Sequence, residues 1–320
     1  MAEGDSTRWR DAFVGSLLGT AIGDALGRPV KGWSASRIAR EHGQVRDMLG
    51  HPRGRYTEDT EMMIVLAEWL LEEPHLDGEG LARRLRARYD PDRDYGRTTT
   101  DVMRRLRAGE NWETAGEHAF ARGSFGNGAA ARIAPCALRL HIETEELARV
   151  VEIAALVTHS HPLGIAGALL QARQIALVLE STGKPLDPAS FIVDLRSATT
   201  SIEFRHKLRT VEECLDRRAP RHVVRDRLGV NATALGSVPT ALFCFLSQAE
   251  SFEEALGYAI DLGGETDSIG AMTGAIAGAR HGASAIPGRW KSVLERGARG
   301  ATYIEEIATR LYEQTFVRGA

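Results

Sequence analysis

The stretch GSLLGTAIGDALG, residues 15–27, has glycine at every fourth position, and GAMTGAIAG, residues 270–278, repeats that spacing. Glycine inside a helix costs about 1 kcal/mol relative to alanine, so this recurrence needs a reason. Residues four apart share one helical face, where a glycine stripe lets a neighbouring backbone or a ligand come close. Tight helix packing is the simpler explanation. Acidic residues touch both stripes, however: Asp24 in the first, and Glu265 and Asp267 just before the second.

Helical periodicity extends over most of the remaining chain. Residues 57–72 place their apolar side chains at helical spacing behind an acidic first turn, and residues 147–157, 164–179, 239–247 and 251–262 repeat the pattern. The apolar/polar alternation typical of strands is scarce. We therefore predict an all-α fold, a compact bundle that forms a single domain over residues 1–320.

Composition restricts the class of protein. The 320 residues are 43% hydrophobic and 26% charged, as in soluble globular proteins, and the net charge of −3 provides no basic field for nucleic acid. Three cysteines, Cys136, Cys214 and Cys244, argue against a disulfide framework and suit a reducing cytoplasm. The longest weakly polar stretch, 269–279, would rise only about 16 Å as a helix, so we expect no membrane span.

Two segments are rich in oxygen ligands. YTEDTE at 56–61 has three acids and two threonines, and GGETDS at 263–268 adds two acids with hydroxyls. Thr57 can be a helix N-cap, and carboxylates in the first turn of that helix interact favourably with the helix dipole. This structural role accounts for one or two of the three acids. The same oxygen donors suit Mg²⁺, Mn²⁺ or Ca²⁺, whereas zinc is disfavoured. Together the segments could hold two metal ions that orient a substrate and activate water.

Two further segments are candidates for ligand binding. In GSFGNG, residues 123–128, three glycines could present backbone N–H groups to an anion, and Phe125 could stack on a base; a plain turn is the alternative. In THSHP, residues 158–162, the histidines could be ligands, acid/base groups or structural donors.

These segments, in this order, resemble the ADP-ribosylglycohydrolase family, which includes the dinitrogenase reductase-activating glycohydrolases. The similarity extends from about residue 15 to residue 290. The matching runs are GTAIGDALG (19–27), YTEDT (56–60), GSFGNG (123–128), TH (158–159), SVPTA (237–241), DLGGETDSI (261–269), GAIAGA (274–279) and IP (286–287).

The resemblance implies an orthogonal multi-helix bundle with a dinuclear metal cleft, and hydrolysis of the bond between ADP-ribose and an acceptor. Two divalent cations are expected, Mg²⁺ first, with Mn²⁺ or Ca²⁺ as alternatives. The implied metal ligands are Thr57, Glu58, Asp59, Glu265, Asp267 and Ser268, with Glu265, Asp59 and Asp267 catalytic. The implied substrate-binding residues are Arg122, Gly123, Ser124, Phe125, Gly126, Asn127, Gly128, His159 and Ala232.

The chain departs from the family pattern at four positions. Glu58 and Glu265 stand where the family usually has aspartate, and Ser268 where threonine is common. The extra methylene moves each carboxylate and can alter the choice of metal. Lys31 stands where the relatives have an acid implicated in metal coordination and acid/base work. A protonated lysine cannot bind a cation and is a poor base.

Two hypotheses follow. The first is a metal-dependent ADP-ribosyl hydrolase. Residues 95–96, 228–232 and 237–239 most resemble the branch of the family that acts on ADP-ribosylserine and poly(ADP-ribose). The second, motivated by Lys31, is a relative that binds ADP-ribose without cleaving it. In both, the partner is an ADP-ribose-bearing molecule, with no membrane involved, and we expect a cytoplasmic monomer.

Overall fold

The structure is a computed structural model that describes residues 3–73 and 75–316. These residues form α-helices and three short 3-10 helices, and contain no strand. The α-helices are α1 (Glu3–Gly27), α2 (Ala35–His42), α3 (Glu58–Glu72), α4 (Gly78–Arg88), α5 (Arg97–Arg107), α6 (Trp112–Ala119), α7 (Gly128–Ala131), α8 (Ala134–Leu140), α9 (Thr144–Leu156), α10 (Pro162–Glu180), α11 (Pro188–Ala198), α12 (Ile202–Asp216), α13 (Arg221–Leu228), α14 (Ala234–Ser247), α15 (Phe252–Asp261), α16 (Thr266–His281), α17 (Gly288–Val293) and α18 (Ala301–Phe316). The 3-10 helices are η1 (Arg28–Val30), η2 (Pro91–Arg93) and η3 (Ala283–Ala285).

The two glycine-striped helices, α1 and α16, pack directly against each other. Gly15, Gly19 and Gly23 face Gly278, Gly274 and Gly270, so the helices run antiparallel. A Cβ atom on any of these glycines would overlap the carbonyl group of its partner. The stripes therefore serve close backbone approach, as the simpler explanation of the sequence predicts. The antiparallel contact also places the C-terminus of α1 beside the N-terminus of α16.

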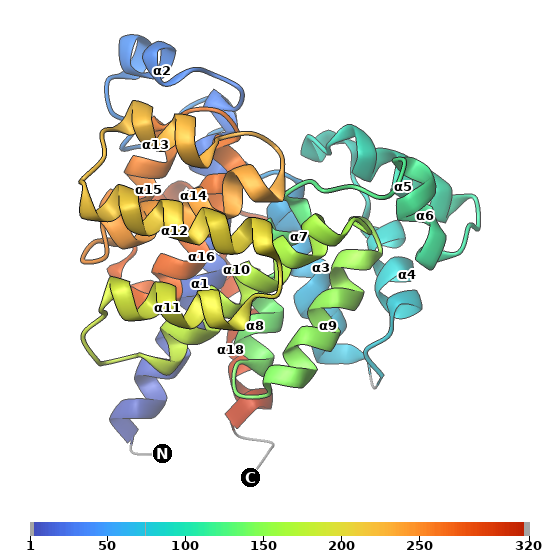
Figure 1. The fold of residues 1–320 in the computed structure, drawn as a ribbon. Helices are drawn as coiled ribbons and strands as arrows, with labels where there is room; N and C mark the ends of the chain where they lie inside the picture. Colours follow the sequence, from blue (N-terminus) through green and yellow to red (C-terminus); the bar gives the residue numbers. More distant parts are fainter. Residues whose placement is uncertain (1–2, 74, 317–320) are drawn as a thin grey trace.

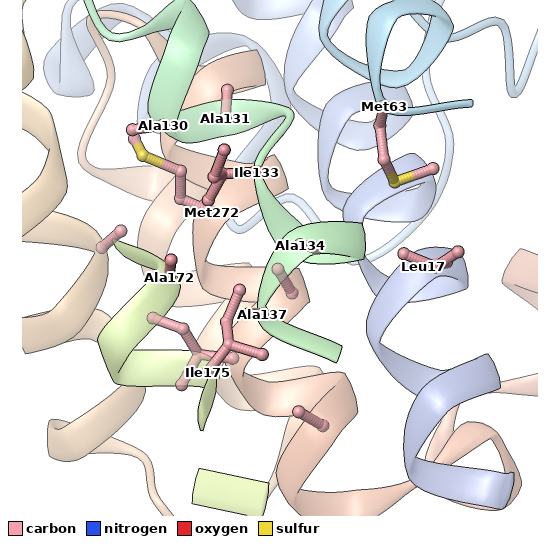
Figure 2. Close-up of a cluster of buried hydrophobic side chains, with 14 of the residues drawn as sticks. Leu17, Met63, Ala130, Ala131, Ile133, Ala134, Ala137, Ala172, Ile175 and Met272 are labelled. Atoms are coloured by element: carbon pink, nitrogen blue, oxygen red, sulfur yellow. The ribbon is translucent and has the colours of Figure 1, made fainter. Parts of the chain in front are cut away.

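The remaining helices surround this pair. Figure 1 shows α4, α5 and α6 on one side of the molecule and α11 to α15 on the other. The buried apolar side chains form one cluster. Figure 2 shows part of it, where Leu17 of α1, Met63 of α3, Ile175 of α10 and Met272 of α16 meet the small alanines of α7 and α8. Small residues at these positions allow the surrounding helices to pack closely.

The all-α prediction is confirmed, and all five predicted helical segments lie within helices apart from one capping residue at some ends. The segment predicted at 239–247 begins earlier, at Ala234, because Thr233 accepts a hydrogen bond from the Gly236 N–H and caps the helix. Stretch 269–279 is not the longest apolar one: α10 has the length and composition of a membrane span. More than half of α10 is buried among neighbouring helices, as in a core helix.

Candidate active site

A pocket of about 200 Å³ lies where the first turns of α3, α5, α7 and α16 meet the segment that follows η1. One side carries Lys31, Glu58, Asp59, Glu265 and Ser268. The pocket is also lined by Ser124 and Gly126–Gly128 of the glycine-rich loop, by His159 and Ala232, and by Gly96, Arg97, Thr98 and Thr99 at the start of α5. The pocket therefore joins both oxygen-rich segments to both predicted ligand-binding segments.

The N-terminus of α3 is anchored by a carboxylate from α1. Asp24 is fully buried and accepts hydrogen bonds from the Thr57 N–H, the Thr60 N–H and the Thr60 hydroxyl at 2.6–3.1 Å. Thr57 in turn caps the helix, because its Oγ1 accepts a bond from the Asp59 N–H. These bonds hold the first turn of α3 in place and direct Glu58 and Asp59 toward the pocket.

The N-terminus of α16 is set by a glycine pair. Gly263 and Gly264 have φ of +72° and +81°, a conformation that side chains rarely adopt. Gly264 accepts a hydrogen bond from the Gly32 N–H at 2.8 Å and donates one to the Trp33 carbonyl at 2.9 Å. This backbone pairing places the segment that carries Lys31 directly beside Glu265.

Lys31 enters the group of carboxylates. Its Nζ lies 2.7 Å from Asp267 Oδ2 and 3.8 Å from Glu265 Oε2. Burial alone would lower the pKa of Lys31, but the carboxylates of Asp267 and Glu58 outweigh it and raise the pKa. Lys31 therefore remains a cation paired with the α16 side of the site.

The carboxylates resist ionisation because they are buried together. Burial and the Asp59 charge raise the pKa of Glu58 to about 9, and burial with Asp24 and Asp267 raises that of Asp59 to about 8. Burial and Asp267 raise the pKa of Asp24 to about 6 despite its hydrogen bonds, and raise that of Glu265 too. The single ammonium of Lys31 does not balance this charge, so the cluster favours further cations or protons.

The donor atoms are of the kind that Mg²⁺ prefers. All are oxygens, and the buried Oε2 of Glu58 has no hydrogen-bond partner among the described residues. Other oxygens are engaged: Asp59 Oδ2 accepts a bond from the Ser268 hydroxyl at 2.7 Å, and Glu58 Oε1 accepts one from the Gly96 N–H. Consequently no three acidic, histidine or cysteine side chains within residues 3–73 and 75–316 are close enough to form a ready-made metal site. The site fits cations in its chemistry, and loading it requires these side chains to rearrange.

The glycine-rich loop is held by the segment before α14. The Asn127 N–H donates to the Ala232 carbonyl, and the Ala234 N–H donates to the Phe125 carbonyl, both at 2.9 Å. This pairing places Ala232 at the pocket. The Phe125 ring lies outside the pocket and is 37% exposed. It forms T-shaped ring contacts with Phe120 and His161.

His159 lines the pocket beneath this loop and is 4% exposed. Its Nδ1 lies 2.7 Å from the Thr158 hydroxyl oxygen. Arg132 donates a hydrogen bond to that same oxygen. Burial and the nearby Arg132 charge lower the pKa of His159 to about 3. His159 is therefore a neutral imidazole at physiological pH.

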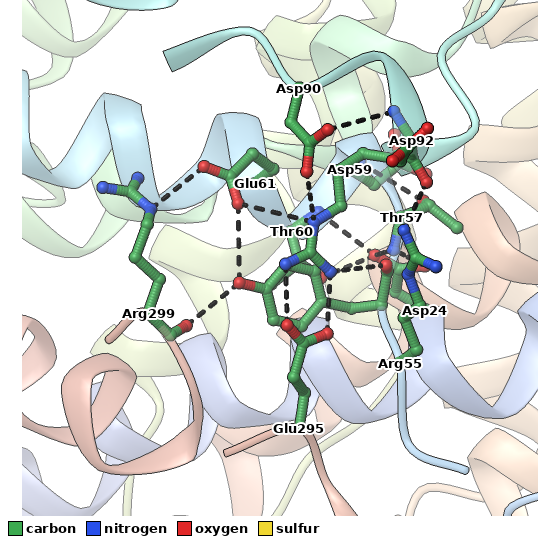
Figure 3. A network of polar contacts seen from close by, with 12 residues as sticks. Asp24, Arg55, Thr57, Asp59, Thr60, Glu61, Asp90, Asp92, Glu295 and Arg299 are labelled. Atoms are coloured by element: carbon green, nitrogen blue, oxygen red, sulfur yellow. Dashed lines mark hydrogen bonds and ion pairs between the residues drawn. The ribbon is translucent and has the colours of Figure 1, made fainter. Parts of the chain in front are cut away.

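Ion pairs beyond the bonds of Asp24 also hold α3, and Figure 3 shows part of this network. Arg93 forms two hydrogen bonds of 2.7 Å with Glu295 and donates a third to the Tyr56 carbonyl. Arg299 Nε lies 3.0 Å from Glu61 Oε1, and its Nη1 donates to Glu68 at 2.6 Å. These ion pairs tie the segment before Thr57 to the C-terminal part of the chain.

Most predicted site residues line the pocket, and five do not. Thr57 and Asp267 are buried behind it, and Arg122, Gly123 and Phe125 lie at the outer end of the loop. Gly123 packs against the backbone of residues 160–161, where a Cβ would overlap.

Some pocket residues were not predicted. This group comprises Gly96, Arg97, Thr98 and Thr99. The hydroxyl-rich run TTT at 98–100 was the sequence feature that could have indicated these pocket residues. A larger open groove of about 1520 Å³ lies near Arg8, Lys184 and Arg310. It contains charges of both signs and none of the predicted site residues.

Comparisons with known proteins identify the family. The family model described as ADP-ribosylglycohydrolase matches residues 5–320. The chain is 36% identical to an uncharacterized protein of Archaeoglobus fulgidus, over 95% of this chain and 96% of that one. It is 31% identical to the ADP-ribosylhydrolase ARH3 of Danio rerio, covering 94% and 90%. A solved structure titled ADP-ribosylglycohydrolase-related protein complex matches with a TM-score of 0.76 at 27% identity, covering 97% and 100%.

Proposed function

This chain belongs to the ADP-ribosylglycohydrolase family, and we propose that it hydrolyses the bond between the anomeric carbon of ADP-ribose and an acceptor. One observation carries the proposal: carboxylates, a glycine-rich loop and a neutral histidine line a single pocket. Relatives named as ADP-ribosylhydrolases, aligned over nearly the whole chain, support the same activity.

The loop side of the pocket would bind the nucleotide. Gly128 can turn its backbone N–H group to the diphosphate, and His159 can contact it from the same pocket. Phe125, exposed beside Phe120, can pack against the adenine. This arrangement leaves the ribose that carries the scissile bond pointing toward the carboxylates.

The carboxylate side would hold two divalent cations, Mg²⁺ first. Thr57, Glu58 and Asp59 would provide ligands from α3, and Glu265, Asp267 and Ser268 from α16. The unpartnered Oε2 of Glu58 supports this proposal. When bound, such cations supply electrostatic stabilisation and a more acidic water.

Glu265 is the residue that we assign to proton transfer. Its carboxylate lines the pocket and is the most exposed of the group. It would take a proton from the attacking water as the new C–O bond forms at the anomeric carbon. The bond to the acceptor then breaks, its electron pair leaves with the acceptor, and Glu265 returns the proton there. One water is consumed for each ADP-ribose released.

The test is release of ADP-ribose from serine, arginine, poly(ADP-ribose), O-acetyl and thymidine conjugates, with Mg²⁺, Mn²⁺, Ca²⁺ or a chelator. We expect chelator-sensitive release from at least one conjugate. Asp59→Asn and Asp267→Asn should lower turnover at least about 100-fold with the fold intact, since each removes a charge at the reacting centre. Asp216→Asn, an exposed acid on α12, is the matched control. Full turnover in both site variants would refute this mechanism.

The ion pair between Lys31 and Asp267 favours a second candidate, binding of ADP-ribose without cleavage. The ammonium stands where the α16 ligands would receive a cation, and it could pair with a phosphate instead. Tight ADP-ribose binding in calorimetry with silence across the conjugate panel would select this candidate. Gain of release in Lys31→Glu would then identify Lys31 as the cause. Release by the unmodified protein would exclude it.

A further inference from the structure

We propose that Arg132 and Thr158 fix His159 as the tautomer protonated on Nε2, so that His159 is a hydrogen-bond donor to the pocket. Arg132 and Thr158 are in this view positioning residues, because they act on the substrate only through His159. The identity of the acceptor that His159 meets rests on the proposed function. The tautomer itself does not.

The first step concerns the donors of Arg132. This side chain follows α7 and is 1% exposed. Its Nη2 lies 2.7 Å from the Ala154 carbonyl and 2.7 Å from Thr158 Oγ1. A guanidinium has only donors, so Thr158 Oγ1 must accept the bond from Arg132.

The second step concerns the single proton of the Thr158 hydroxyl. Thr158 Oγ1 lies 2.7 Å from His159 Nδ1, and one of the two atoms must donate. If Nδ1 donated, the hydroxyl proton of the fully buried Thr158 would have no acceptor among the described residues. If the hydroxyl donates, all three groups are satisfied. A buried polar group without a partner costs about 1–3 kcal/mol, so the second arrangement is favoured.

The third step follows from the ring itself. With Nδ1 as acceptor, a neutral imidazole carries its proton on Nε2. Protonation of both nitrogens would place a cation beside the buried charge of Arg132. Nε2 faces Gly126 and Gly128, where Cβ atoms would lie 3.2 Å and 3.4 Å from it. The glycines thus keep the Nε2 edge clear for a ligand.

A donor at this position selects its ligand. The group that meets Nε2 must be an acceptor, and in ADP-ribose the diphosphate oxygens are the strongest acceptors. We therefore assign His159 to the diphosphate, as a neutral donor that adds no charge to the site.

Nitrogen NMR tests the tautomer directly. Long-range ¹H–¹⁵N spectra of the full chain with ¹⁵N-labelled histidine, at pH 7, distinguish the two neutral tautomers and the imidazolium. The His159 signals are identified by their absence in His159→Gln. We expect the Nε2–H pattern for the unmodified protein. An Nδ1–H pattern or an imidazolium would overturn the proposal.

Two substitutions separate the hydroxyl from the packing of the side chain. Thr158→Ser keeps the hydroxyl and should keep the Nε2–H pattern and bind ADP-ribose within about twofold of the unmodified protein. Thr158→Val removes the hydroxyl, so we expect mixed tautomers and at least about fivefold weaker binding in calorimetry. Thr210→Val, on the exposed side of α12, controls for loss of a threonine hydroxyl elsewhere. Unchanged spectra and binding in Thr158→Val would refute the role of Thr158.

The outcomes also separate this proposal from the proposed function. The spectra require no turnover, so the expected tautomer in a protein that releases no ADP-ribose would contradict the hydrolase assignment alone. Release of ADP-ribose by a protein with the Nδ1–H tautomer would contradict the present proposal alone.

Discussion

Asp24 shows how one residue can organise the site from outside the pocket. It belongs to α1, yet its carboxylate accepts hydrogen bonds from three donors at the start of α3: two backbone N–H groups and the Thr60 hydroxyl. Hydrogen bonds to a charged acceptor contribute about 1.5–3 kcal/mol each. The position of Glu58 and Asp59 thus depends on a carboxylate that does not line the pocket.

Asp24→Asn should destabilise the protein by about 1–3 kcal/mol, because the new amide group would face donors that need an acceptor. Urea unfolding measures this change. Asp187→Asn, at the exposed N-cap of α11, is the matched control and should cost less. A loss no larger than the control's would show that Asp24 does not hold α3.

His159 predicts a pH dependence of stability. Its folded-state pKa of about 3 lies below the usual value near 6.5, because of burial and Arg132. Below pH 6.5 the His159 side chain binds a proton in the unfolded chain but not in the folded chain. Stability should therefore fall as the pH drops from about 6.5 toward 3, by up to about 1.4 kcal/mol per pH unit for this one proton.

Unfolding of the unmodified protein and of His159→Gln, between pH 7 and pH 4, checks this sign. His141 and His281, whose pKa values are also lowered by burial, act in the same direction in both proteins. The difference between the two pH profiles therefore isolates His159. Parallel profiles would contradict the prediction.

At the scale of elements, the contact between α1 and α16 sets the geometry of the site. The glycine stripes bring the two backbones together, and the Ser16 hydroxyl and the Thr266 hydroxyl donate across the contact to Ala275 and Gly27 carbonyls. No side chain separates the helices, so their register is rigidly defined. That register decides how far Asp24 and Lys31 lie from Asp267.

Gly19→Ala tests this contact away from the carboxylates. The added Cβ would overlap the Gly274 carbonyl. The overlapping atoms belong to the backbone, so no flexible side chain can move to relieve the clash. We expect a loss of about 3 kcal/mol or more, at the upper end of the usual cost of overpacking. Gly288→Ala, in α17 with no atom within 4 Å of the added Cβ, is the control and should change stability little. Equal melting temperatures for the two variants would contradict the prediction.

The sequence allowed prediction of those features that depend on local pattern. Helical spacing predicted α3 and α10, the glycine period predicted the tight contact, and acids before apolar runs predicted the two helix N-termini that meet. Contacts between residues that are far apart in the sequence could not be predicted. The ion pair of Lys31 follows from the pairing of Gly32 with Gly264, over 200 residues apart. No local signal predicted the bond from Arg132 to Thr158 either, because a buried arginine looks like a surface residue in sequence.

At the scale of the whole molecule, the carboxylate group brings together acids from three parts of the chain that are far apart in the sequence. Asp24 comes from α1, Asp59 from α3 and Asp267 from α16, and all three are buried together. Mutual repulsion among them opposes folding unless cations or protons intervene. The stability of the entire fold should therefore report on occupancy of the site.

Addition of Mg²⁺ or Mn²⁺ to chelator-treated protein should raise the melting temperature, since a ligand that binds only the folded state stabilises it. At a concentration 100 times the Kd the gain is about 2.7 kcal/mol. Differential scanning calorimetry measures the shift, and Asp59→Asn should reduce it. A melting temperature insensitive to every divalent cation would contradict the proposed cation site.

The antiparallel contact of α1 with α16 has a consequence for synthesis in the cell. The partner of the first helix is made late, and at about 5–20 residues per second the delay is on the order of ten seconds or more. During that interval the apolar faces of α1, which carry Leu17, Leu18 and Ile22, have no α16 to cover them. A nascent chain stalled before residue 266 would expose this surface to chaperones, and its site would lack Asp267 and Ser268.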